Sequence, residues 1–147
     1  MVDVLTEITI SKPVEVVAGY AANPDNTPEW YANIKSVEWH TSRPLKIGSL
    51  VGFKAKFLGR LLAYVYEVTE WIPIQKLVMQ TADGPFPMET TYIWTAINAQ
   101  TTKMTLRNKG NPKGFSRLFT PFMEKMMRRA NNKDLKKIKQ VLESMQE

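Results

Sequence analysis

The stretch from residue 36 to residue 110 consists of strand-type segments with no helical period, and this feature restricts the possible folds most strongly. Runs rich in β-branched and aromatic residues are separated by turn residues such as Gly48, Ile72-Pro73 and Asp83-Gly84-Pro85. Because the connections are short, successive strands are expected to pair antiparallel, as a meander. The six predicted strands are 36–42, 49–57, 61–71, 76–82, 88–97 and 102–110.

Residues 2–10 precede this meander and alternate apolar with polar side chains, which predicts a seventh, half-buried strand. Two short amphipathic helices are expected to follow it. Ser11 is the expected N-cap of the first helix, with Pro13 in its first turn, and Asn23-Pro24 ends it. Asp25 or Thr27 is expected to cap the second helix, which begins with Pro28 and buries Trp30, Tyr31 and Ile34.

Residues 114–146 change to apolar residues at three- and four-residue steps, which predicts a long C-terminal helix. Pro121 lies inside this pattern and should kink the helix or separate it from a short leading helix. No repeat, linker or low-complexity segment divides the chain, so residues 1–147 are expected to form a single domain.

Composition places the chain among water-soluble globular proteins. Its hydrophobic fraction is 44% and its charged fraction 23%, and no apolar run approaches the ~20 residues of a membrane span. The N-terminus lacks the pattern of a signal peptide, and there are no cysteines to form disulfides or thiolate metal sites. These observations together favour a cytoplasmic location.

Several segments share their order and spacing with one known family. They are Ile8 to Val17, Asn23-Pro24-Asp25 before Trp30, Ile47-Gly48, Val68 to Pro73, Thr101 to Thr105 and Leu135 to Glu143. The chain resembles the START/Bet v 1-like (SRPBCC) superfamily over nearly its full length, and within it the polyketide cyclase/dehydrase-like branch of small bacterial proteins. The resemblance implies an α+β helix-grip fold. In this fold a curved seven-stranded antiparallel sheet and two short helices wrap around the long C-terminal helix, and the fold hosts carriers, receptors and a few enzymes.

Strand phase predicts which side chains line the concave face. Lys54 and Lys56 should face water, and the alternate residues of each strand then point inward. Phe119, Phe122, Met123 and Met126 should oppose them from the helix. Periodicity alone favours a filled core, whereas the resemblance favours a ligand cavity. The predicted ligand-binding residues are Phe53, Tyr64, Tyr66, Met79, Tyr92, Trp94, Met104, Phe119, Met123 and Met126, with Trp30 near the mouth.

Signatures of metal, nucleotide and acyl-transfer chemistry are missing from the sequence. His40 is the single histidine, and its phase places it on the solvent face of its strand. Glu67, Glu70, Asp83 and Glu89 are isolated carboxylates that are expected to be solvated or paired. The chain has no Gly-x-Ser-x-Gly elbow, P-loop or Gly-x-Gly-x-x-Gly motif. We therefore expect no metal and no cofactor.

Positive charge is concentrated near the C-terminus. Residues 113–147 hold nine Lys or Arg against four Asp or Glu, whereas residues 1–112 are nearly balanced. A solvated helix face is the first explanation, and docking on an anionic surface is the alternative. No aromatic residue follows Phe122, which argues against nucleic acid as the partner. The strongest charge feature of the sequence is the set of Lys125, Arg128, Arg129, Lys133, Lys136, Lys137 and Lys139.

Three functions remain open from the sequence. The first is binding or carriage of a small hydrophobic or amphipathic molecule, by a monomer or a homodimer. The second is a cofactor-free cyclase or dehydrase that uses Tyr64, Tyr66 and Tyr92, for which a neighbouring cation such as Arg60 or Arg107 would be required. The third is an interaction protein whose basic helix docks on an acidic surface. A binding role without catalysis is favoured.

Overall fold

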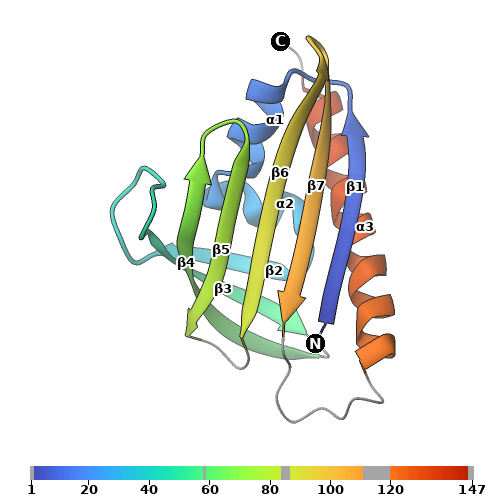
Figure 1. The fold of residues 1–147 in the computed structure, drawn as a ribbon. Coiled ribbons are helices and arrows are strands. Elements are labelled where there is room, and N and C mark those ends of the chain that lie inside the picture. Colours follow the sequence, from blue (N-terminus) through green and yellow to red (C-terminus); the bar gives the residue numbers. More distant parts are fainter. Residues whose placement is uncertain (1, 58, 84–86, 111–119, 146–147) are drawn as a thin grey trace.

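The computed structural model describes residues 2–57, 59–83, 87–110 and 120–145. Seven strands form one antiparallel sheet in the order β1-β7-β6-β5-β4-β3-β2, and the sheet curls around the long helix α3 (Figure 1). This is the expected helix-grip arrangement. The strands are β1 (Val2–Ile10), β2 (Ile34–Trp39), β3 (Leu50–Phe57), β4 (Arg60–Ile72), β5 (Lys76–Asp83), β6 (Met88–Asn98) and β7 (Thr101–Gly110).

Every predicted strand is present, and no strand end differs by more than three residues from the expected one. Two glycines adopt the positive φ angles that glycine permits: Gly48 (91°) shortly before β3 and Gly59 (77°) directly before β4. The pairing of β4 with β5 shifts register twice, between Val65 and Tyr66 and between Val68 and Glu70. Such irregularities increase local twist and bend a strand. In Figure 1 the sheet curls most visibly at β2, β3 and β4.

The two short helical segments follow β1 as expected, but their caps differ from the prediction. Helix α1 (Val14–Ala21) begins after Pro13, and the predicted cap Ser11 instead donates its backbone N–H to Glu143 Oε2 at 2.8 Å. This contact with α3 joins residues far apart in the sequence, so a local pattern does not show it. A single 3-10 turn, η1 (Pro24–Asn26), then leads into α2 (Thr27–Trp30), whose N-cap is Asn26 rather than Asp25 or Thr27.

Helix α3 (Thr120–Glu143) buries Leu135, Ile138 and Leu142 against the sheet and α1. Pro121 is the second residue of α3, and the leading helix predicted before it falls on residues 114–119, outside the described residues. Phe122 was expected to point inward, but 61% of its surface is exposed. Met123, which was predicted to face inward as well, is buried against Val2 and Val4 of β1.

Side chains of α3 also cover the free edge of β1, which pairs with β7 on one side only. Arg128 Nη1 and Lys139 Nζ donate to the carbonyl oxygens of Leu5 and Thr9, each at 2.9 Å. At two other points the backbone donates, from Asp3 N to Glu124 Oε2 at 3.1 Å and from Ser11 N to Glu143. The helix therefore satisfies backbone groups that an edge strand otherwise presents to solvent.

Candidate ligand-binding cavity

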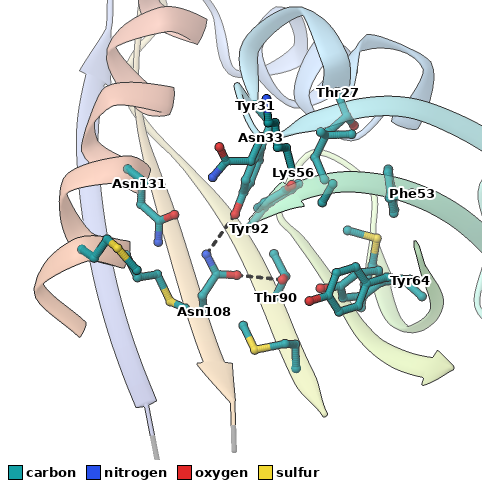
Figure 2. Close-up of a pocket in the computed structure, with 18 of the residues that line it drawn as sticks. Thr27, Tyr31, Asn33, Phe53, Lys56, Tyr64, Thr90, Tyr92, Asn108 and Asn131 are labelled. Atoms are coloured by element: carbon teal, nitrogen blue, oxygen red, sulfur yellow. Dashed lines mark hydrogen bonds between the residues drawn. The ribbon is translucent and has the colours of Figure 1, made fainter. Parts of the chain in front are cut away.

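A cavity of about 370 Å³ lies between the concave face of the sheet and α3 (Figure 2). This volume falls within the usual range of small-molecule sites. Five aromatic and five methionine side chains dominate the described lining. The exposed residues Asn33 and Lys56 mark its rim. The described lining consists of Thr27, Tyr31, Asn33, Ile34, Phe53, Ala55, Lys56, Tyr64, Tyr66, Met79, Met88, Thr90, Tyr92, Asn108, Met123, Met126, Met127, Ala130 and Asn131.

Most of the residues predicted from strand phase come together here. Phe53 and Tyr66 meet edge to face with ring centroids 5.7 Å apart, and Tyr64 lies 6.1 Å from Tyr66. The strand register is therefore as expected, because one residue of slip would have turned these rings to the outer face. The predicted residues found in the lining are Phe53, Tyr64, Tyr66, Met79, Tyr92, Met123 and Met126.

Trp30, Trp94 and Met104 do not line the cavity, which corrects the prediction. Each is buried in the apolar core, with exposed fractions of 1%, 4% and 0%. Helix α1 packs on β6 and β7, and its apolar residues belong to the same core cluster. Strand phase shows the face of the sheet that a residue occupies, but not whether a helix covers that position. The remaining predicted residue, Phe119, lies outside the described residues.

A chain of hydrogen bonds crosses one wall of the cavity, and the sequence analysis missed it. Thr90 Oγ1 donates to Asn108 Oδ1 at 2.7 Å, and Asn108 Nδ2 donates to the Tyr31 hydroxyl at 3.2 Å (Figure 2). Thr90 and Asn108 are paired across β6 and β7. Strand phase places Thr90 and Asn108 on the inward face, so it could have identified them. The prediction of lining residues was restricted to the apolar and aromatic side chains of that face. These hydrogen-bonded side chains give an otherwise apolar cavity one polar wall.

Asn131 and Asp134 of α3 were also missed, although each has only 2% of its surface exposed. Asp134 Oδ1 accepts the backbone N–H of Ala32 at 3.0 Å. Within the described part of the chain, Asp134 Oδ2 and Asn131 Nδ2 have no hydrogen-bond partner. Burial raises the pKa of Asp134 from 3.8 to about 6, and the Ala32 N–H and the Lys133 charge oppose this rise in part. Asn131 lines the cavity.

The cavity tyrosines are held in their neutral form. Burial raises the pKa of Tyr31, Tyr66 and Tyr92 above the ordinary value of 10.0, and mutual electrostatic interaction adds to the rise for Tyr66 and Tyr92. Arg107, one of the two cations proposed to activate them, is instead paired with Asp3 at 2.6 Å. The other, Arg60, is exposed. These hydroxyls can donate hydrogen bonds at neutral pH but cannot act as bases.

The other titratable groups singled out by sequence lie outside the cavity lining as described. His40 is exposed and 3.9 Å from Glu38, and Glu70 pairs with Lys76 at 3.0 Å. Glu67, Asp83 and Glu89 do not line the cavity either. No cluster of three or more potential metal ligands occurs within residues 2–57, 59–83, 87–110 and 120–145.

The basic residues of α3 divide into two groups. Arg128 and Lys139 bond to the edge of β1, and Lys139 also pairs with Glu143 at 2.6 Å. The remaining residues are exposed, and some of them line a shallow depression on the outer face of the helix. These exposed residues are Lys125, Arg129, Lys133, Lys136 and Lys137.

The curled sheet, the gripped helix and the cavity agree with a comparison against protein families. Residues 1–143 match the profile of the family described as polyketide cyclase/dehydrase and lipid transport. The chain belongs to this family. The family and the solved structures below confirm the expected START-like fold of the SRPBCC type. A search of curated protein sequences found no match. None of the helices in the described part of the chain is long and apolar enough to cross a membrane.

Solved structures with the same fold share little sequence with this family member. A START superfamily protein from Mycobacterium smegmatis has a TM-score of 0.82 at 11% identity, covering 98% of this chain and 99% of its own. A protein from Thermus thermophilus has a TM-score of 0.81 at 18% identity, with coverages of 95% and 96%. An aromatase/cyclase from Streptomyces has a TM-score of 0.78 at 13% identity, with coverages of 96% and 93%.

Proposed function

We propose that this family member binds a small hydrophobic or amphipathic molecule in the cavity between the sheet and α3. The observation that carries the proposal is a cavity of about 370 Å³. Its described lining combines aromatic rings, methionines and the hydrogen-bonded side chains of Thr90, Asn108 and Tyr31. A few placed polar groups in an apolar cavity are typical of ligand sites. Unbranched methionine side chains can repack around guests of different shape, which suits a broad apolar selectivity.

Native mass spectrometry of the purified protein tests this function directly, because a molecule bound with high affinity should be retained. After organic extraction, the protein should then bind the tricyclic ketone 9-fluorenone saturably, with one molecule per chain, by isothermal titration calorimetry. Absence of a retained molecule, together with no saturable binding of 9-fluorenone or its hydrocarbon fluorene, would falsify the proposal.

A cofactor-free cyclase is the second candidate, and the observation in its favour is the set of neutral hydroxyls in the cavity. Tyr66 and Tyr92 keep their protons, so they could donate to a carbonyl oxygen on which negative charge develops. The described lining contains no carboxylate and no imidazole that could remove a proton from carbon. Binding without catalysis therefore ranks first. Turnover of a polyketone that survives Tyr64→Phe, Tyr66→Phe and Tyr92→Phe together would exclude the tyrosine mechanism.

A further inference from the structure

We propose that the Asn131 amide and the Tyr31 hydroxyl form a donor pair that binds a neutral carbonyl oxygen of the ligand. This inference rests on the proposed binding function and specifies the chemical class of the ligand. It assigns the polar end of the molecule to the wall of the cavity formed by α3 and the segment after α2. The apolar remainder of the ligand would then lie against the aromatic and methionine side chains.

Asn131 is the first half of the pair. It is 98% buried, it borders the cavity, and its Nδ2 has no partner in the described residues. Figure 2 shows its side chain reaching from α3 toward Asn108 and Tyr31. A buried amide donor without an acceptor destabilises the folded state, so its presence at the cavity wall calls for an acceptor. A ligand oxygen in the cavity would supply one.

Tyr31 is the second half. Asn108 Oδ1 is occupied by the Thr90 hydroxyl, so the Asn108 amide nitrogen faces Tyr31 and donates to it. The Tyr31 oxygen is therefore an acceptor within this chain, and its own hydrogen is left to donate elsewhere. Donors arranged in sequence polarise one another, which strengthens the last donor. All of these side chains line the cavity.

The charges around this end of the cavity favour a neutral oxygen over an anionic one. Asp134 lies one helical turn beyond Asn131, is 2% exposed, and is close enough to raise the pKa of both Tyr31 and Tyr92 electrostatically. A carboxylate or phosphate placed beside Asn131 would be repelled by it. Lys56 is the one cationic side chain in the described lining, and it is exposed at the rim. A ketone, aldehyde or amide oxygen fits these surroundings.

Three probes with the same ring system test the inference: 9-fluorenone, fluorene and fluorene-9-carboxylate. The wild type should bind the ketone about 10-fold more tightly than the hydrocarbon, and the carboxylate no more tightly than the hydrocarbon. Asn131→Leu, which keeps the volume and removes the amide, should weaken ketone binding by about 5-fold and change fluorene binding less than twofold. Met127→Leu is the control: it changes an apolar side chain of α3 in the same cavity, and it should change the affinities for 9-fluorenone and fluorene by the same factor.

Tyr31→Phe provides an independent second variant, with the same expected selective loss for the ketone. Equal affinity of the wild type for ketone and hydrocarbon, or losses in both variants that are the same for both probes, would overturn the donor pair and leave the binding function standing. Tighter binding of the carboxylate than of the ketone would also overturn it. Binding of no probe at all would instead remove the proposed function and the inference with it.

Discussion

A buried carboxylate destabilises a fold unless its oxygens are bonded, and Asp134 has one bonded oxygen and one without a partner in the described residues. The protonated form of Asp134 is therefore favoured by folding, and the pKa is raised to about 6. Because the pKa of Asp134 is higher in the folded state than in the unfolded state, its protonation stabilises the folded state. This stabilisation is complete below pH ~4 and is lost as pH rises through about 6. Asp134 holds the segment after α2 against α3, and it also destabilises the folded protein at neutral pH.

Replacing Asp134 with asparagine should remove this pH dependence. Asparagine retains an acceptor for the Ala32 N–H but carries no charge. The free energy of unfolding of Asp134→Asn, relative to wild type, should rise by roughly 2–3 kcal/mol between pH 4 and pH 7, because one pKa unit corresponds to about 1.4 kcal/mol. Urea denaturation at both pH values measures it. The exposed Asp83→Asn serves as control, and a relative stability that is the same at both pH values would contradict the assignment.

At the scale of elements, α3 has two structural roles, carried by different faces of the helix. Its apolar stripe packs on the sheet, while Glu124, Arg128, Lys139 and Glu143 bond to the edge of β1. Two of the basic residues that sequence reasoning assigned to a solvated or docking face therefore have structural partners. An uncovered edge strand is a template for pairing with another chain, so this cover also keeps the edge from associating.

Removing the two cations that reach the β1 carbonyls should destabilise the protein. The double variant Arg128→Met and Lys139→Met keeps the apolar stems and should lower the free energy of unfolding by roughly 1–2 kcal/mol in urea, about 0.5–1 for each lost hydrogen bond. The matched double variant Lys136→Met and Lys137→Met loses the same charge from exposed positions and should change it by less than ~0.5 kcal/mol. Equal effects of the two double variants would show that net charge, rather than edge bonding, is responsible.

For the whole molecule, the interior is packed where α1, β6, β7 and the C-terminal half of α3 meet, and hollow beyond that region. Filling the hollow should therefore separate binding from stability. Ala130 lines the cavity from α3, and Ala130→Phe places a ring in the space proposed for the ligand. We expect at least a roughly tenfold loss of 9-fluorenone affinity with no loss of stability, because new apolar contacts replace empty volume.

Calorimetry for binding and urea denaturation for stability check this prediction together. Gln140→Phe adds the same ring to an exposed position of α3 and should leave fluorenone binding unchanged. Ligand binding that survives Ala130→Phe would place the bound molecule somewhere other than this cavity.

The order of the elements, the strand register and the face on which Tyr64, Tyr66 and Tyr92 lie could all be predicted from the sequence. Side-chain alternation and turn residues are local properties, and a slip of one residue would have exposed every one of these rings. The family resemblance added the helix-grip arrangement, which the comparisons confirm. The start of α1 was misjudged, because the N-cap is Pro13 and no side chain caps the helix.

Where the interior is filled and where it is empty depends on tertiary contacts and could not be predicted. Trp94 and Tyr92 share a strand face, yet one lies in the core and the other also borders the cavity. That difference depends on where α1 and α3 cross a bent sheet, and these crossings are set by contacts between residues far apart in sequence. Asn131 and Asp134 lie four residues before the buried Leu135 and Ile138, so helical spacing places them on the inward side of α3, but as polar residues they do not belong to the apolar pattern. Their burial follows from the packing of α3 against the segment after α2, because a cavity is the space that folded elements leave between them.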